Sequence, residues 1–125
     1  MSITELLLST AKEDTELLIS NNARGDNFDV PRVVDFLLTT NDLDKAEITR
    51  DFIDDNKYGN VSIEQSGEQY RVITKILMPI NQNIICSVSG LLACVGKIFG
   101  LEYDGWGSVL QNDKVANAAD QPLTR

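Results

Sequence analysis

The sequence contains no histidine, so it lacks the commonest general base of enzymes and the commonest metal ligand. Its 2 cysteines, Cys86 and Cys94, form no paired-cysteine metal pattern. No Gly-x-x-x-x-Gly-Lys-Ser/Thr segment is present to cradle a phosphate. We therefore expect a protein that is not an enzyme and that binds neither a metal nor a cofactor.

Basic residues are scarce as well. There are 11 lysines and arginines against 19 aspartates and glutamates, a formal net charge of −8, and the basic residues do not cluster along the chain. Such a charge repels phosphate backbones, so direct binding of nucleic acid is disfavoured. A basic surface on another protein is the partner that this composition favours.

Long apolar runs and a secretory leader are also missing. No apolar run approaches the roughly 20 residues that span a membrane, so no membrane association is expected. Cys86 and Cys94 would lie about 12 Å apart on one helix, too far for a disulfide. Free thiols indicate a cytoplasmic protein. Without a secretion signal, the triplet Arg24-Gly25-Asp26, known as an adhesion motif, is interpreted as chance.

What remains is the composition of a globular protein, with 42% hydrophobic and 24% charged residues in 125. This length suits one domain, which we expect over residues 1–112. The stretch 113–125 is polar and alanine-rich, which predicts a disordered tail.

Hydrophobic periodicity predicts the elements. It indicates an extra N-terminal helix within residues 1–20, whose apolar stripe Thr10 and Asp14 interrupt, so its middle should pack loosely. Strands follow at 30–39, 60–65, 70–78 and 101–108, and helices at about 42–56 and 82–99. Strand-helix-strand-strand-helix-strand is the ferredoxin-like βαββαβ order, an α+β sandwich with a four-stranded antiparallel sheet. The two later helices should cover one sheet face.

The other sheet face should carry many apolar side chains, which need a cover. The N-terminal helix is the candidate for that cover, and without it this face would become the partner site. Strand alternation assigns these residues to the face: Val33, Leu37, Ile73 and Leu77, together with Arg71, Lys75, Asp104 and Trp106.

The helix at 42–56 is strongly acidic. It is interpreted either as a solvated face or as a docking surface for a basic segment. Asn41 is its expected N-cap. Its acidic residues are Asp42, Asp44, Glu47, Asp51, Asp54 and Asp55.

The helix at 82–99 is apolar on one side and has small residues on the other. A helix without a charged face is usually buried on two sides. Either the N-terminal helix packs on the small residues, or a second copy of the chain does and forms a homodimer. The small residues are Cys86, Ser89, Ala93 and Gly96.

The last strand holds the single tryptophan, Trp106, between two glycines. Glycine weakens a strand unless the strand bends or another backbone comes close. Strict alternation would place Tyr103 on one face and Trp106 on the other. Trp106 then either covers the sheet or contacts a partner, and Glu102 with Asp104 is read as a solvated rim rather than a catalytic pair.

The run Glu102-Tyr103-Asp104-Gly105-Trp106-Gly107 follows an apolar helix in a small acidic chain. In this run, and in the order of elements back to about Phe28, the chain resembles the regulator of ribonuclease E activity B family. The resemblance implies a cytoplasmic bacterial protein that binds ribonuclease E and restrains RNA decay without catalysis. The expected contacts are the acidic helix and Glu102, Tyr103, Asp104 and Trp106.

Two alternatives stay open. Family members often carry a long acidic C-terminal tail, whereas here only Asp113 and Asp120 are acidic after Gln111. This difference, together with the apolar helix at 82–99, leaves room for a diverged relative with another protein partner. Ferredoxin-like sheets also bind RNA by stacking bases on aromatic residues. That alternative is weaker, because aromatic residues are few and the net charge is negative.

Overall fold

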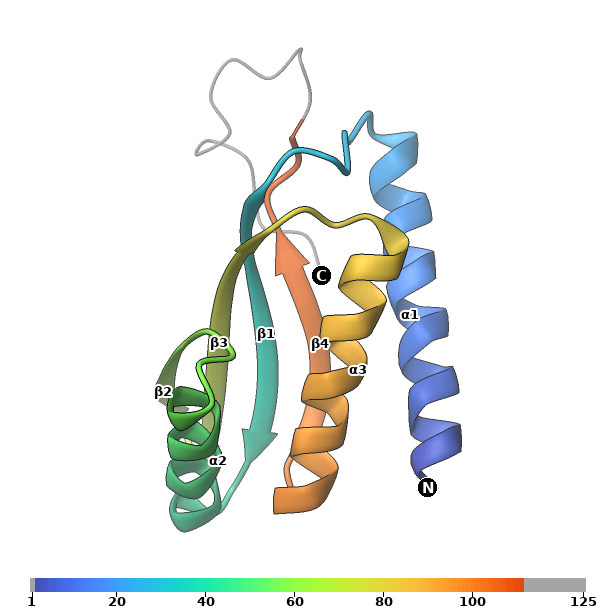
Figure 1. Cartoon of the computed structure of the whole chain (residues 1–125). Coiled ribbons are helices and arrows are strands. Elements are labelled where there is room, and N and C mark those ends of the chain that lie inside the picture. Colours follow the sequence, from blue (N-terminus) through green and yellow to red (C-terminus); the bar gives the residue numbers. More distant parts are fainter. Residues whose placement is uncertain (1, 112–125) are drawn as a thin grey trace.

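A computed structural model gives the fold of the chain and describes residues 2–111, so the predicted tail at 113–125 lies outside the described residues. The elements follow the predicted order (Figure 1). They are α1 (Ile3–Ala23), β1 (Arg32–Thr40), α2 (Leu43–Asp55), β2 (Asn60–Ser66), β3 (Gln69–Met78), α3 (Gln82–Phe99) and β4 (Glu102–Ser108).

The sheet has four strands in the order β2-β3-β1-β4, and each neighbouring pair is antiparallel. Helix α2 packs on β2 and β3, and α3 packs on β4 and β1, so both helices cover the same face of the sheet (Figure 1). The core lies between this face of the sheet and the two helices, and it includes Phe36, Leu38, Ile53 and Leu92. The predicted α+β, ferredoxin-like arrangement is thereby confirmed.

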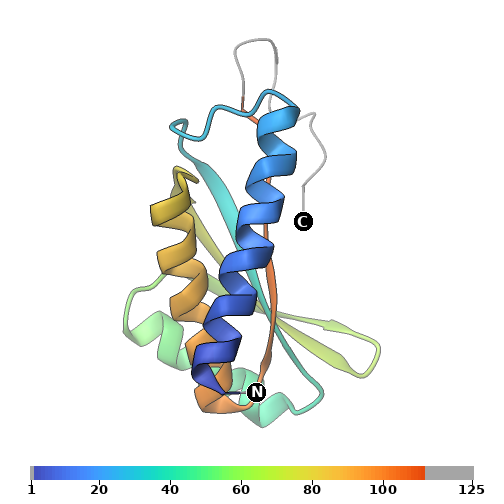
Figure 2. The same cartoon turned by 90° about the vertical axis from the view of Figure 1, so that its right-hand side faces the viewer.

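Helix α1 lies beside α3, on the same side of the sheet as the other helices (Figures 1 and 2). The prediction that it covers the opposite face is wrong. Its buried residues are Thr10, Asp14, Leu18 and Asn21, which recur every three or four positions and therefore form one face. That face is largely polar, and its middle is buried rather than loosely packed.

The sheet face away from the helices is only partly apolar. Val33 pairs with Leu77 at one end of this face, and their side chains are 51% and 72% exposed. Leu37 pairs with Ile73 near the middle, and both are buried. Two of the four apolar residues predicted for this face are therefore exposed to solvent.

Strand β4 contains a bulge. Trp106 pairs with Phe36 and Tyr103 pairs with Leu38, so β4 advances by one more residue than β1 between these pairs. The extra residue lies at Asp104-Gly105, and Gly105 has φ of 88°. The predicted bend is present, but the predicted alternation is wrong, because Tyr103 and Trp106 both point to the helix side.

A buried ion pair fixes the linker between α1 and β1. The Arg32 guanidinium donates to both carboxylate oxygens of Asp26 at 2.7 Å and to the Asn27 carbonyl at 2.7 Å. The backbone N–H of Gln111 also donates to the Asp26 carboxylate. Because Asp26 is buried, the Arg24-Gly25-Asp26 triplet cannot present its carboxylate to a receptor.

Candidate functional site

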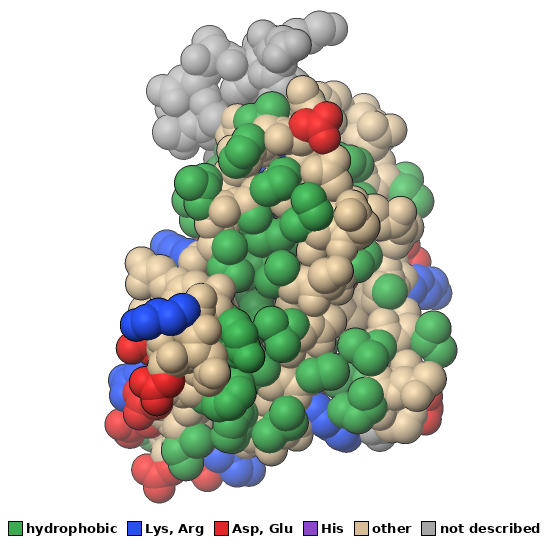
Figure 3. Space-filling model, viewed as in Figure 1, with side chains coloured by type: hydrophobic (Ala, Val, Ile, Leu, Met, Phe, Trp, Pro, Cys, Tyr) green, Lys and Arg blue, Asp and Glu red, His purple; other side chains and the backbone are tan. Residues whose placement is uncertain are grey.

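Helix α2 presents most of its acidic residues to solvent. Ala46, Thr49 and Ile53 are buried against the sheet, so the remaining faces of the helix carry the charge. The space-filling view shows acidic side chains gathered over α2 at the lower left (Figure 3). The exposed members are Asp42, Asp44, Asp51, Asp54 and Asp55, and Glu47 is partly exposed.

These carboxylates differ in the hydrogen bonds and ion pairs that they form within the protein. Asp42, not the predicted Asn41, is the N-cap, and its carboxylate accepts from the Asp44 amide at 3.0 Å. Arg50 pairs with Asp51 at 3.0 Å and lies 4.0 Å from Glu47.

Asp54 and Asp55 lie in the last turn of α2, which contains no basic residue. No salt bridge within the described residues involves either of them. Negative charge at a helix C-terminus opposes the helix dipole, so helix stability does not explain these two residues.

An apolar stripe lies beside this acidic helix. It consists of exposed residues of α2 and α3, and hydrophobic side chains run down the middle of the helical face there (Figure 3). Patches of this kind mark interaction surfaces when they adjoin polar residues. We call it the outer apolar stripe: Ile48 on α2, and Leu91 and Ile98, two turns apart on α3.

Among the described residues, α3 is also the one helix that is long and apolar enough to span a membrane by length and composition. A buried helix of a folded domain passes the same test. Here α3 packs against β4, β1, α1 and α2, which accounts for its apolar composition.

The residues predicted around Trp106 separate into two groups. Glu102 and Asp104 are exposed, as a contact surface requires. Trp106 is 2% exposed and its indole N–H donates to Asp14 Oδ1 at 2.9 Å. Of the two alternatives for Trp106, the ring belongs to the core and does not form part of an exposed contact surface. Tyr103 is half-buried, with its hydroxyl 2.6 Å from Ser89 Oγ.

The small residues of α3 face the interior of the same molecule. Ser89, Ala93 and Gly96 are buried, and Cys86 is half-buried. A Cβ on Gly96 would lie 2.7 Å from Leu38 Cδ2 of β1. Asp14 of α1 accepts a hydrogen bond from Ser89, so α1 packs on this face. Of the two interpretations, packing by the N-terminal helix is the one that the structure shows, and Ser89, Ala93 and Gly96 are buried within the same molecule.

A buried polar cluster joins α1, α3 and β4. Asp14 is 3% exposed, and its Oδ1 accepts from Ser89 Oγ at 3.0 Å and from Trp106. Since the Ser89 hydroxyl donates to Asp14, the Tyr103 hydroxyl donates to Ser89. No N–H or O–H group among the described residues donates to Asp14 Oδ2.

Burial raises the pKa of Asp14 to about 6, against the lowering effect of its Ser89 and Trp106 hydrogen bonds, and nearby Glu13 raises the pKa further. The weak thiol donor of Cys86 lowers it slightly. Burial, and then the neighbouring Asp14, also raise the pKa of Cys86. The Cys86 thiol is therefore protonated at neutral pH and is a poor nucleophile.

Sequence reasoning missed Asp14 as a candidate site residue. The available signal was its position, a carboxylate in the middle of an otherwise apolar helical stripe. Periodicity alone treats such a residue as an interruption of the apolar stripe. A buried carboxylate with a perturbed pKa, however, is a common feature of functional sites.

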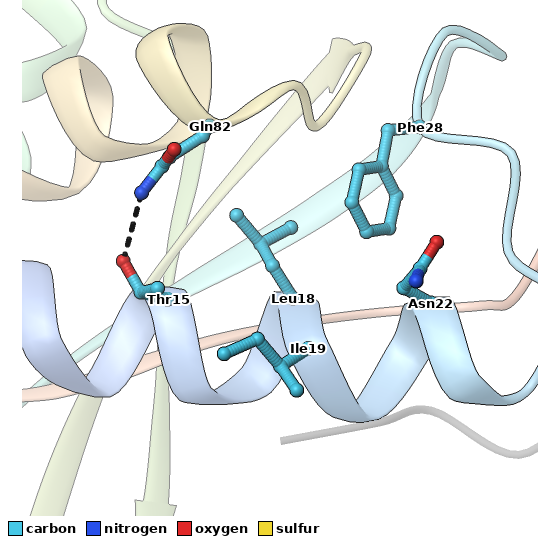
Figure 4. A pocket seen from close by; sticks show the side chains of 6 residues that line it. All are labelled: Thr15, Leu18, Ile19, Asn22, Phe28 and Gln82. Atoms are coloured by element: carbon cyan, nitrogen blue, oxygen red, sulfur yellow. Dashed lines mark hydrogen bonds between the residues drawn. The ribbon is translucent and has the colours of Figure 1, made fainter.

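Three of the pockets formed by the described residues border α1. One of them, of about 270 Å³, is lined by Leu6, Ala93, Lys97, Leu101, Glu102 and Tyr103. A pocket of about 120 Å³ lies between α1 and the β4 bulge, lined by Glu13, Asp14, Leu17, Asp104, Gly105 and Trp106. A mostly apolar pocket of about 230 Å³ lies between the second half of α1 and the start of α3 (Figure 4). There Gln82 donates to Thr15 at 3.1 Å, and Leu18 and Phe28 approach from α1 and from the linker.

Residues 2–111 contain no group of three or more histidine, cysteine, aspartate or glutamate side chains arranged to hold a metal ion. The described residues instead form the exposed acidic face of α2, the outer apolar stripe and a small acidic pocket, which are features of a binding surface.

A comparison with protein-family models identifies a family to which most of the chain is similar. The family described as regulator of ribonuclease activity B matches residues 11–108, from within α1 to the end of β4. The matched span contains the acidic helix, the apolar helix and the Glu102–Gly107 run. No curated protein sequence gives a significant match.

Proposed function

The chain belongs to the regulator of ribonuclease activity B family, and from this premise we propose that it is a non-catalytic cytoplasmic protein that binds ribonuclease E and lowers the cleavage of some transcripts. By the resemblance, the bound segment is the basic, flexible scaffold region of that ribonuclease. The observation that carries the proposal is the exposed acidic face of α2 next to the outer apolar stripe.

The two surfaces have complementary roles in this proposal. Exposed carboxylates act over about 10 Å at 0.1 M salt, so they attract a basic segment before it makes contact. The outer apolar stripe then buries the apolar side chains of the same segment and slows its dissociation. A segment that carries both basic and apolar residues fits this combination.

Binding of RNA on the sheet has less support. The register places Phe36 and Tyr70 on the helix side together with Tyr103 and Trp106. The open face of the described sheet therefore carries no aromatic ring on which a base could stack. The net charge of −8 adds repulsion of the phosphate backbone.

The acidic face is tested with two triple variants of equal charge change. The first is Asp51→Asn, Asp54→Asn, Asp55→Asn, and its control is Glu16→Gln, Glu64→Gln, Glu68→Gln; each set removes three exposed carboxylates, one of them ion-paired. Calorimetric titration with the scaffold region of ribonuclease E should show weaker binding for the first set only, together with less inhibition of RNA cleavage.

Equal loss in both sets would mean that only net charge matters. Absence of binding by the unmodified protein would overturn the assignment of ribonuclease E and favour a diverged relative with another partner.

The outer apolar stripe is tested with a matched pair of single-residue variants. Ile98 on α3 and Leu8 on α1 are 69% and 68% exposed, so serine at either position should leave the fold intact. Ile98→Ser is expected to weaken binding of ribonuclease E by about tenfold, the size of a moderate contact residue, with Leu8→Ser close to wild type. The same titration measures both variants, and equal affinities would exclude the stripe from the interface.

A further inference from the structure

The pocket between α1 and the β4 bulge has an unusual lining. Three of its residues, Glu13, Asp14 and Asp104, are carboxylic acids, and Trp106 forms another part of the wall. Glu13 and Asp104 are exposed at the surface, whereas Asp14 is buried. No salt bridge within the described residues joins any of the three to a basic side chain. The pocket therefore concentrates negative charge without an internal counter-ion.

Asp14 supplies an independent reason to expect a ligand. Its Oδ1 is held by Ser89 and Trp106, but no N–H or O–H group among the described residues donates to the buried Oδ2. A buried carboxylate oxygen without a donor costs free energy, about 1–3 kcal/mol for a typical buried polar atom and more for a charged one. An incoming donor with positive charge would remove that cost, since it provides both a hydrogen bond and a counter-charge.

The size and lining of the pocket select the class of cation. The described residues show no cluster suited to a metal ion. The volume of about 120 Å³ is below the roughly 300–1,000 Å³ of small-molecule sites but admits one side-chain head group. The carboxylates of the lining suit an ammonium or a guanidinium group, because either one donates hydrogen bonds to carboxylate oxygens and neutralises their charge.

We propose that this pocket receives the cationic head group of an arginine or lysine side chain from the bound protein partner, between Asp14 and the rim carboxylates Glu13 and Asp104. The inference rests on the proposed function, because a basic segment supplies such a side chain. It adds a defined contact for one residue of that segment, near the β4 bulge and separate from α2.

The pocket can be tested without the ribonuclease. Trp106 is the single tryptophan of the chain and lines the pocket, so its fluorescence reports on this site. The probe is N-acetyl-arginine amide, and N-acetyl-citrulline amide is the uncharged control of nearly the same shape. Arginine amide should change the emission of the full chain saturably, and citrulline amide at equal concentration should not.

Matched variants separate the pocket from net charge. Glu13→Gln and Asp104→Asn change exposed residues and should each weaken binding of arginine amide by about two- to fivefold, the range for a partly exposed charge pair. Glu16→Gln and Asp55→Asn remove the same charge elsewhere and should change affinity little. Equal weakening by all four variants, or equal responses to arginine and citrulline amides, would overturn the inference.

A second measurement connects the pocket to the partner. The double variant Glu13→Gln, Asp104→Asn should release the ribonuclease E scaffold region faster than wild type does. If the scaffold region dissociates from the double variant at the same rate as from the wild-type protein, the inference is overturned while the proposed function stands. Saturable binding of arginine amide without any binding of ribonuclease E would instead overturn the proposed function and leave the cation pocket supported.

Discussion

At the scale of single residues, Asp14 has the clearest energetic consequence. Burial favours its neutral form, and its pKa in the folded chain is about 6 against 3.8 for an unperturbed aspartate. Between these values the folded state holds a proton that the unfolded chain has lost. The contribution of this proton to stability is therefore fully present below about pH 4 and is lost as pH rises through about 6.

Asp14→Asn should remove this pH dependence, because the amide oxygen can still accept from Ser89 and Trp106 but the charge is gone. We expect the free energy of unfolding of wild type to fall, relative to the variant, by about 2–3 kcal/mol between pH 4 and pH 7. Urea denaturation at several pH values measures the difference between the two proteins.

The pH dependence is the readout, since the buried amide N–H₂ also changes absolute stability. The other titratable groups around Asp14 are Glu13, Cys86, Tyr103 and Asp104. Glu16→Gln, an exposed position of α1 outside this group, serves as the control. A stability difference between wild type and Asp14→Asn that stays constant from pH 4 to pH 7 would show that Asp14 is not a buried acid with a raised pKa.

At the scale of elements, the β4 bulge decides which side chains reach the core. Gly105 has φ of 88°, which side chains other than glycine rarely adopt, while a Cβ there would meet no atom within 4 Å. Gly105→Ala should therefore cost only backbone strain, about 1–2 kcal/mol. Gly105→Asn should cost less, since asparagine tolerates a positive φ. Thermal unfolding of both variants tests this order; equal destabilisation would assign the cost to something other than φ.

Gly96 provides the contrast. Its φ is not in the left-handed region, but a Cβ would lie 2.7 Å from Leu38 Cδ2 and 3.1 Å from the Leu101 carbonyl oxygen. Overpacking of this kind costs about 1–3 kcal/mol or more, because a backbone atom cannot move aside easily. Gly96→Ala should therefore be destabilising even though alanine is the better helix former.

How much of the fold could be predicted from the sequence differs between elements. The order of strands and helices follows from periodicity, and the span Gln82–Phe99 of α3 agrees with the prediction. Periodicity left two placements open for α1, on the open face of the sheet or on the small residues of α3. It could not choose between them, since the buried face of α1 includes Thr10, Asp14 and Asn21 and its exposed face includes Leu8 and Ile19. Tertiary hydrogen bonds to Asp14 decide that packing, and they join residues far apart in the chain.

The candidate site was predicted unevenly for the same reason. The acidic residues of α2 are adjacent in sequence, so composition identified them directly. The flanking glycines of Trp106 indicated a bend, but only the pairing with β1 shows that one extra residue turns Trp106 into the core. The pocket combines α1 with β4, a combination that no local pattern contains.

At the scale of the whole molecule, removal of negative charge from the acidic face of α2 should raise the stability of the fold and lower the affinity for the partner. Asp54 and Asp55 oppose the dipole of α2, so Asp54→Asn with Asp55→Asn should stabilise the fold by about 0.3–1 kcal/mol per residue. The same double variant should bind ribonuclease E less tightly. Thermal unfolding and titration of the same sample measure both effects, and a variant that is less stable and binds unchanged would contradict both.

Salt provides the last test, because it acts on the acidic face without any mutation. The Debye length falls from about 10 Å at 0.1 M salt to about 3 Å at 1 M, so attraction between exposed charges is largely screened at high salt. Affinity for the ribonuclease E scaffold region should therefore decrease steeply as salt rises, mainly through slower association. The Asp51, Asp54, Asp55 triple variant should show a shallower dependence, since it has fewer charges to screen. An affinity that is equal at both salt concentrations would assign binding to the outer apolar stripe alone.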